Sequence, residues 1–158
     1  MNDFKTIRFS VDQHVATLTL DNPSKRNALD PAMRVEVAQV VSHIRRDPSI
    51  RALILTGANG HFCSGGDLKN IATVGLDNQG WRQRLQDLHM WLQDLLTLDR
   101  PVIAAVDGAA AGAGFSLALA ADFVLATPRA RFCMSFLKVG LVPDCGAFYT
   151  LQIGRAHV

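Results

Sequence analysis

The stretch "RPVIAAVDGAAAGAGFSLALAADFVLA" (residues 100–126) decides the fold that this chain can adopt. It opens with a short apolar run, 102–106, of the kind that forms a strand buried on both faces of a sheet. A turn of glycine and alanine follows and leads into a helix of small residues, after which 123–127 indicates a second strand. Strands that alternate with helices in this way predict an α/β domain.

The same alternation continues toward the N-terminus. Another buried strand is predicted at 51–57, where "RALILTG" also ends in a glycine. Residues 6–12 and 14–20 alternate apolar and polar side chains, so they predict a hairpin of two strands.

Two amphipathic helices are expected between these strands. Asp30 followed by Pro31 combines a capping carboxylate with a proline at the first helical position, and this helix should end before Pro48. A second helix is predicted over 80–98, because apolar residues recur there at helical spacing. These residues are Trp81, Leu85, Leu88, Trp91, Leu92, Leu95 and Leu96.

The composition argues against several classes of protein. The chain has 158 residues, 49% of them hydrophobic, which suits one domain with its own core. Its formal net charge is only +2, so neither nucleic acid nor a membrane is expected as a partner. The N-terminus lacks the layout of a secretion signal, and we expect a cytoplasmic protein. No metal site or disulfide framework is expected from the spacing of Cys63, Cys133 and Cys145.

The last six residues of the chain are interpreted separately from the domain. The letters "IGRAHV" (153–158) match one reading frame of a common sequencing-adapter oligonucleotide, so we interpret them as a non-native tail. We therefore expect 1–152 to form the domain. Codons that do not spell the adapter would exclude this interpretation.

Two loops of small residues are the candidates for chemistry: "CSGGDLKN" (63–70) and "GAAAGAG" (108–114), each directly after a predicted buried strand. Ligands bind open α/β sheets at the carboxyl ends of strands, and small residues let a ligand approach backbone N–H groups. Two such loops could form an oxyanion hole, while close packing without a ligand is the alternative for each. Neither loop matches the full dinucleotide fingerprint or a P-loop.

Four blocks of the sequence, in their order and at their separations, resemble the crotonase family of enoyl-CoA hydratases and isomerases, which stabilise a thioester enolate. The blocks are "NPSKRNALD" (22–30), "LILTGANGHFCSGGDL" (53–68), the stretch 100–126 and "FLKVGLVPDCG" (136–146). The resemblance covers residues 4–152 and implies a spiral of ββα turns, truncated before a C-terminal helical region. It also implies an acyl-CoA thioester as substrate, coenzyme A being part of that substrate and no separate cofactor being needed. A homotrimer or hexamer is implied for the full-length protein.

The resemblance assigns roles to particular residues. The two oxyanion donors of the family fall on the backbone N–H groups of Gly66 and Ala113. The loop that contacts CoA in the family falls on Lys25, Arg26 and Ala28, although residue type alone would make them a solvated loop.

The first glycine-rich loop is also expected to shape the acyl pocket. Asp67 is interpreted as holding the loop through hydrogen bonds from its side chain to the backbone, with Leu68 beside the acyl group. The other residues expected to bind the substrate are Ser64, Gly65 and Phe136.

The sequence departs from typical hydratases at two positions. Those enzymes resemble one another in having two glutamates that hold and activate a water. At the two matching positions this chain has Ser116 and Phe136. Asp144 matches the position of the acid in isomerase-type members, such as the ring-epoxide isomerases of phenylacetate breakdown. One carboxylate suffices to move a proton between two carbons, so we expect Asp144 to be the base. The alternative role of Asp144 is the N-cap of a helix that begins there.

We therefore predict an acyl-CoA isomerase and leave three alternatives open. A hydratase would use Asp144 or a bound water. Family dehalogenases pair an aspartate near this position with a histidine near His89, although a lone helical histidine usually lies on the surface. The third alternative is an inactive fragment that associates through exposed apolar surface.

Overall fold

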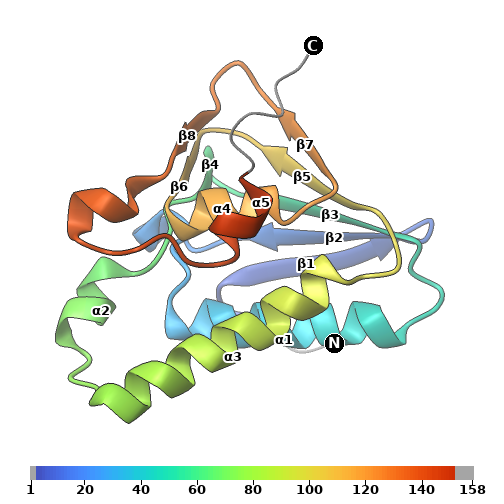
Figure 1. Ribbon diagram of the computed structural model, residues 1–158. Coiled ribbons are helices and arrows are strands. Elements are labelled where there is room, and N and C mark those ends of the chain that lie inside the picture. The colour runs from blue at the N-terminus through green and yellow to red at the C-terminus, as the bar shows by residue number, and fades with distance from the viewer. Residues whose placement is uncertain (1–2, 152–158) are drawn as a thin grey trace.

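The computed structural model describes residues 3–151, which form two sheets with helices around them (Figure 1). The larger sheet has the strand order β1-β2-β3-β5-β7, in which β1 and β2 are antiparallel and the other pairs are parallel. Its strands are β1 (Ile7–Asp12), β2 (Val15–Leu20), β3 (Ala52–Gly57), β5 (Val102–Val106) and β7 (Phe123–Ala126). The predicted hairpin is thereby confirmed.

A smaller parallel sheet has the order β4-β6-β8. Its strands are β4 (His61–Cys63), β6 (Ala109–Ala111) and β8 (Arg131–Cys133). Each of them directly follows a strand of the larger sheet, so the chain visits both sheets before it forms the next helix. The sequence predicted loops at β4 and β6, because a short run of small residues has no alternation that would indicate a strand.

The helices complete a repeated ββα turn, which confirms the predicted spiral. After β1 and β2 come the 3-10 helix η1 (Pro23–Lys25) and α1 (Pro31–Arg46). The later turns end in α2 (Leu68–Thr73) and α3 (Asn78–Leu96), then in α4 (Ala113–Leu119), and finally in the 3-10 helix η2 (Ser135–Val139) and α5 (Ala147–Thr150).

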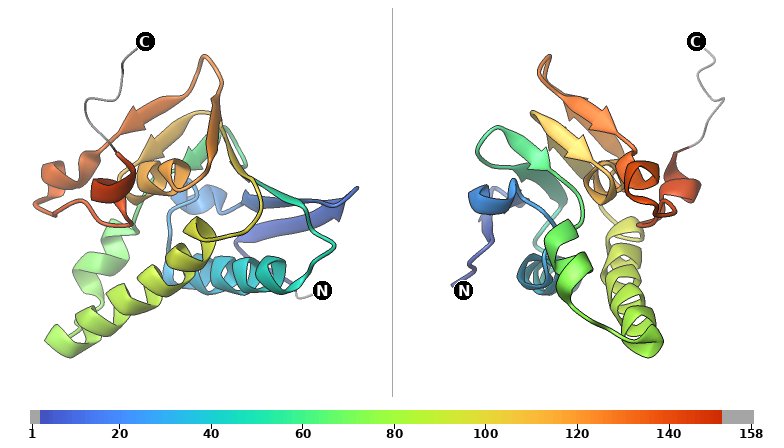
Figure 2. Two further views of the ribbon diagram at one scale, coloured as in Figure 1. Left: turned by 45° about the vertical axis from the view of Figure 1, so that its right-hand side comes forward. Right: turned by 90° about the vertical axis from the view of Figure 1, so that its left-hand side faces the viewer.

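Helices α1 and α3 lie side by side under the larger sheet (Figures 1 and 2). The start of α1 is as predicted, because the Asp30 carboxylate accepts a hydrogen bond of 2.9 Å from the Met33 amide. The apolar stripe of α3 is buried only in its C-terminal half, at Leu88, Trp91, Leu92 and Leu95. Leu85 and Leu96 belong to the apolar stripe that the sequence predicts, but both are exposed, so the prediction is wrong at these two positions. The N-terminal half of α3 extends past the sheet (Figure 1).

The surface of the later elements is strongly apolar. All residues of β7 are exposed, and so are large apolar side chains of η2 and α5. Within residues 3–151, no helix is both long and apolar enough to cross a membrane, and no three metal-ligating side chains gather. The interpretation of 153–158 as a non-native tail lies outside the described residues.

Candidate active site

A cavity of about 80 Å³ lies where the two glycine-rich loops meet. The loops after β4 and β6 supply one wall of it: Ser64, Gly65, Gly66, Gly112 and Ala113. A second wall comes from η2 and the turn that follows it: Ser135, Phe136, Val139, Leu141, Asp144 and Cys145. Segments that are far apart in the sequence therefore share one small space.

Close packing holds the two glycine-rich loops against each other. Gly65 has a φ of +99°, and a Cβ at this position would lie 2.6 Å from the Ala111 carbonyl oxygen and 3.5 Å from the Ala113 nitrogen. A Cβ on Gly114 would lie 2.3 Å from the Cys63 carbonyl oxygen. Only glycine fits at either position without moving the backbone. The packing alternative and the oxyanion hypothesis are thus compatible, because the packing brings the two backbones together.

The N–H groups of Gly66 and Ala113 belong to residues that line the cavity, and neither has an acceptor within residues 3–151. Ala113 is the first residue of α4, where a helical N–H lacks an intrahelical acceptor. The N–H groups of Phe115 and Ser116 instead return to the Gly112 carbonyl, at 3.0 and 3.1 Å. Two unpaired donors on two loops are the arrangement that stabilises an anionic oxygen.

Asp144 is the one carboxylate among the residues described as lining this cavity. Its Oδ1 atom is buried and has no hydrogen-bond partner in the described chain. Leaving a buried acceptor unpaired costs about 1–3 kcal/mol, so such an atom marks a place that a ligand or a water completes. Oδ1 is therefore free to accept a proton from a group bound in the cavity.

The interpretation of Asp144 as a helix cap is wrong. Helix α5 has Gly146 at its N-cap position, and no side chain caps it. Cys145 and Gly146 both have positive φ, +52° and +74°, so the chain turns sharply between Asp144 and the helix. A non-glycine residue in this region is strained, and such strain gathers at functional sites.

Arg34 of α1 lines the same cavity and was missed by the sequence analysis. Its Nε donates a hydrogen bond of 2.9 Å to the Leu29 carbonyl. Burial lowers the pKa of Arg34, and the positive charge of Arg84 lowers it further. The negative charge of Asp144 raises this pKa. Burial, followed by the negative charge of Asp144, raises the pKa of the Cys145 thiol. Cys145 is thus held neutral beside the acid.

Lys25 connects the loop before α1 to the first glycine-rich loop. Its Nζ lies 2.8 Å from Asp30 Oδ2 and 2.9 Å from Asp67 Oδ2. The hydrogen bonds to Asp30 and Asp67 raise the pKa of Lys25, and the bond from Lys25 lowers the pKa of Asp67. Asp67 Oδ1 also accepts a bond of 3.1 Å from the Asn70 amide and so caps α2. The Ser64 hydroxyl donates to the Lys25 carbonyl at 3.0 Å.

The other residues proposed from the sequence fall into two groups. Ser64, Gly65, Leu68 and Phe136 line the cavity, with Phe136 buried and Leu68 half exposed. Outside the cavity lie Lys25, Arg26, Ala28 and Asp67. Arg26 is exposed with a φ of +51°, whereas Ala28 is buried.

The cavity receives no second acid or base from the remaining candidates. Ser116 is fully buried, and its hydroxyl donates to the Gly112 carbonyl at 3.4 Å. His89 is exposed on α3 and does not line the cavity, so the arrangement gives no support to dehalogenation.

Comparisons with known proteins point to one family. The family model described as "Enoyl-CoA hydratase/isomerase" matches residues 10–158. A probable enoyl-CoA hydratase of Rhodobacter capsulatus is 42% identical over 157 residues, which cover 98% of this chain and 59% of that protein. The 1,2-epoxyphenylacetyl-CoA isomerase of Escherichia coli K12 is 40% identical over 151 residues, or 93% of this chain and 58% of the relative.

Solved structures agree with the sequence relatives. The crystal structure of an enoyl-CoA hydratase from a Polaromonas species has a TM-score of 0.86 and 41% identity to this chain. The match covers 92% of this chain and 57% of the Polaromonas chain. The chain therefore spans somewhat less than three fifths of the relatives that it matches.

Proposed function

Because the chain belongs to the enoyl-CoA hydratase/isomerase family, we propose that it acts on an acyl-CoA thioester and shifts a double bond by moving one proton. One observation carries this proposal. The unpaired Oδ1 of Asp144 shares a cavity with the unpaired amides of Gly66 and Ala113, and no other acid is described there. A lone base beside two oxyanion donors suits proton transfer between carbons better than activation of a water by two carboxylates.

The first step is removal of the α-proton of a 3-enoyl thioester. Asp144 takes the proton from C2, and the electron pair of that C–H bond moves toward the thioester oxygen to give an enolate. The amides of Gly66 and Ala113 hold this oxygen as its charge grows. One such donor is typically worth about 3 kcal/mol of transition-state stabilisation.

The second step returns the same proton. The carboxylic acid of Asp144 donates it to C4, whose new C–H bond uses the electron pair of the C3–C4 double bond. The enolate collapses, the thioester carbonyl re-forms, and the double bond now joins C2 and C3. Asp144 is again a carboxylate, so the cycle needs no other proton donor.

The coenzyme A part of the substrate is proposed to lie along Lys25, Arg26 and Ala28. Arg26 is the better partner for a phosphate, because its side chain is exposed. The ammonium of Lys25 is already shared between Asp30 and Asp67. Lys25 then acts by fixing the loop on which Arg26 and the oxyanion donor Gly66 are placed.

We further propose a homotrimer or hexamer for the full-length protein. Support comes from the apolar face of β7, where Phe123 and Leu125 are 60% and 64% exposed. An exposed apolar edge strand favours association with another chain or segment. The inactive-fragment alternative uses the same surface and predicts aggregation instead of a defined oligomer.

A hydratase is the second candidate function. It is favoured by the name of the Rhodobacter relative, a probable enoyl-CoA hydratase. Two residues argue against a hydratase. Typical hydratases resemble one another in having glutamates at two positions, where this chain has Ser116 and Phe136. The products distinguish the two: a hydratase gives a 3-hydroxyacyl thioester, whereas an isomerase gives only the shifted alkene.

The test is deuterium exchange in D2O with a 3-enoyl-CoA, followed by mass spectrometry of substrate and product. It uses the longest chain that the gene encodes. We expect Asp144→Asn to slow exchange and isomerisation by about 10²–10⁴-fold, the usual contribution of a general base. The matched control is Asp107→Asn, because Asp107 is paired with Thr127 and Arg129 away from the cavity.

Each outcome bears on a different part of the proposal. Exchange by Asp144→Asn at the wild-type rate would remove Asp144 as the base. A wild-type protein that leaves 3-enoyl-CoA unchanged but converts 2-enoyl-CoA to the 3-hydroxyacyl thioester would replace the isomerase with the hydratase. The 158-residue chain is assayed separately, and if it binds no CoA ester and elutes as aggregate, it is an inactive fragment.

A further inference from the structure

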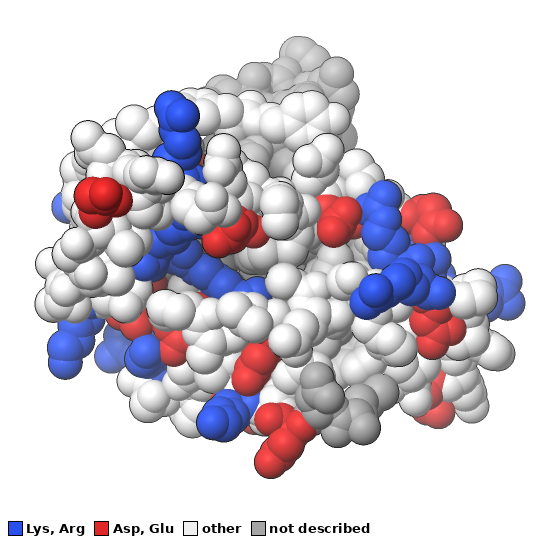
Figure 3. Space-filling model, turned by 90° about the horizontal axis from the view of Figure 1, so that it is seen from below, with Lys and Arg blue, Asp and Glu red and all other residues white. Residues whose placement is uncertain are grey.

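A groove of about 1000 Å³ runs between α1 and α3 and adjoins the catalytic cavity. Arg34 and Leu88 line both spaces, so the groove lies beside the cavity that would hold the acyl group next to the oxyanion donors. Seen from below, the molecule has a hollow in which Lys and Arg atoms lie at the floor (Figure 3). An apolar acyl group alone would not require positively charged side chains at the floor of this groove.

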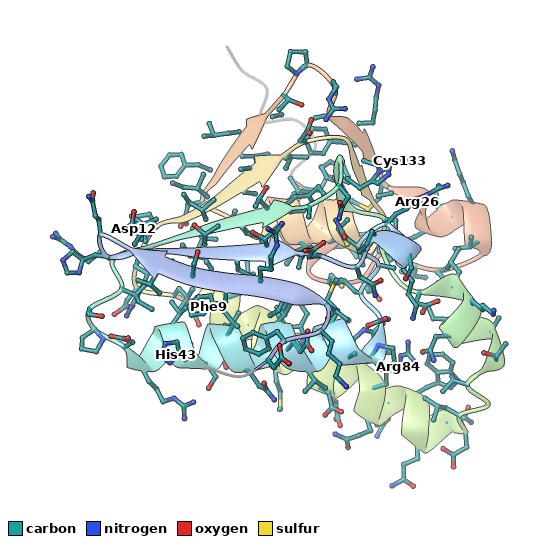
Figure 4. The ribbon with its side chains drawn as sticks, turned by 180° about the vertical axis from the view of Figure 1, so that it is seen from behind. Phe9, Asp12, Arg26, His43, Arg84 and Cys133 are labelled. Atoms are coloured by element: carbon teal, nitrogen blue, oxygen red, sulfur yellow. The ribbon has the colours of Figure 1, made fainter. Side chains whose placement is uncertain are left out.

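Arg84 of α3 lines this groove and has an unused donor. Its Nη2 atom is buried and has no hydrogen-bond partner in the described chain. The guanidinium is nevertheless held firmly: Nη1 donates to Asn70 Oδ1 at 2.8 Å, and the group lies over the Trp81 ring, 5.2 Å from its centroid. Figure 4 shows Arg84 between α1 and α2. The orientation of the free donor is therefore set before any ligand binds.

Within the described chain, neither Arg34 nor Arg84 forms an ion pair. Asp87 also lines the groove, and it accepts a hydrogen bond of 2.7 Å from Gln83. Burial lowers the pKa of Arg84 and of Arg34, and the charge of Arg84 contributes to the effect at Arg34. Neither guanidinium lies within 4.0 Å of a carboxylate oxygen in residues 3–151. The acids Asp30 and Asp67 are already used by Lys25. The charges of Asp144 and Asp67 act on these arginines only from a distance, and half-buried like charges without a direct ion pair favour an anionic ligand.

We propose that Arg84, assisted by Arg34, binds a carboxylate at the far end of the acyl group, so that the substrates are CoA monoesters of dicarboxylic acids. This inference rests on the proposed function, because it takes the acyl group from the oxyanion hole into the groove. The planar fork of arginine matches a carboxylate, and Arg84 presents a fixed donor to it. Arg84 would thus determine specificity without touching the reacting atoms.

The chain offers a matched control in the same groove. Arg46 also lines it but is exposed, and its Nε donates to the Ser42 carbonyl at 3.1 Å. Replacing Arg46 by methionine removes a positive charge from the groove and leaves Arg84 in place. A general effect of groove charge would therefore appear in both variants, and a specific site only in Arg84→Met.

The experiment measures binding of saturated CoA esters by calorimetry. Each monoester in the series from succinyl-CoA to sebacyl-CoA is compared with the fatty acyl-CoA of equal length. We expect at least one dicarboxylic ester to bind about tenfold more tightly than its methyl-ended partner, as one charged hydrogen-bonding group allows. Arg84→Met should lose this preference and bind the methyl-ended esters as before, while Arg46→Met should keep it.

Some results would overturn this inference without affecting the proposed function, and another would contradict the proposed function. Equal binding of the two ester classes by the wild type, or an unchanged preference in Arg84→Met, would overturn the carboxylate site. If Arg84→Met fails to fold, Arg84→Gln takes its place, and an unchanged preference there has the same meaning. Saturated esters need no proton transfer, so a wild type that binds neither class contradicts the proposed function itself.

Discussion

The two walls of the proposed active-site cavity are built in different ways. On the amide side, added Cβ atoms on Gly65 and Gly114 would lie 2.6 and 2.3 Å from backbone oxygens of the opposite loop. On the acid side, a Cβ on Gly140 would meet nothing within 4 Å, and Leu137 and Val142 are 81% and 71% exposed. The segment that carries the acid lies at the margin of the molecule (Figure 2).

This difference indicates which part of the site the fold determines most strongly. The two amides are positioned by backbone contacts inside the core, so their geometry follows from the packing of β4 and β6. Asp144 is positioned by a strained turn and by a few buried neighbours such as Cys145 and Phe136. Stability and catalysis should therefore be coupled on the amide side and separable on the acid side.

The largest effect is expected for Gly114→Ala. Its Cβ would overlap the Cys63 carbonyl, so α4 must move away from β4 and take the Ala113 amide with it. We expect the free energy of unfolding to fall by about 3 kcal/mol, the upper range for overpacking, and deuterium exchange to be lost. Urea unfolding and the exchange assay check this. A variant of wild-type stability and rate would show that the amide side is not tightly packed.

A smaller effect is expected for Asp67→Ala, which removes the cap of α2 and the partner of Lys25. Loss of an N-cap costs about 1 kcal/mol. The pKa of Asp67 is lower in the folded chain than in the unfolded one, chiefly because Lys25 donates to it. The charged form therefore stabilises the fold above about pH 4, and this contribution disappears as the pH falls through the lower, folded pKa.

Urea unfolding of both proteins at several pH values measures this difference. The gap between wild type and Asp67→Ala should be widest near neutral pH and shrink in acid. Asp67→Asn, which keeps an acceptor for the Asn70 amide, should fall between them. A gap that grows in acid would contradict the assigned ion pair.

The smallest effect is expected for Gly140→Ala on the acid side. Its φ of +70° disfavours any residue with a Cβ, but the surrounding space is open. The cost should be about 1 kcal/mol of backbone strain, with the exchange rate unchanged. Thermal unfolding and the exchange assay check this. A loss as large as that of Gly114→Ala would remove the distinction between the two walls.

The sequence predicted those elements whose signals are local. Alternation identified the β1–β2 hairpin, and Asp30 with Pro31 placed the start of α1. The short strands β4 and β6 were missed because they exist through pairing with each other and with β8, which is distant in the sequence. The helix α2 was taken for part of a loop, although Asp67 has the residue type of a cap.

The site shows the same division. The sequence left open whether the two glycine-rich loops approach a ligand or only pack closely, and the distances at Gly65 and Gly114 show that they pack closely. The cap interpretation of Asp144 was wrong, because residue type does not reveal that Cys145 has a positive φ. Arg84 was missed although it lies four residues before the buried Leu88. That spacing places an arginine in line with the buried stripe of α3, which is the signal that could have revealed it.

The most direct test of the central claim is a crystal structure of the protein with a slowly reacting acyl-CoA. The account predicts a thioester oxygen at about 2.7–3.2 Å from both the Gly66 and the Ala113 nitrogens, with an Asp144 carboxylate oxygen facing C2 of the acyl group. A thioester oxygen bound to only one of these amides, or an Asp144 side chain turned away from the acyl group, would contradict it.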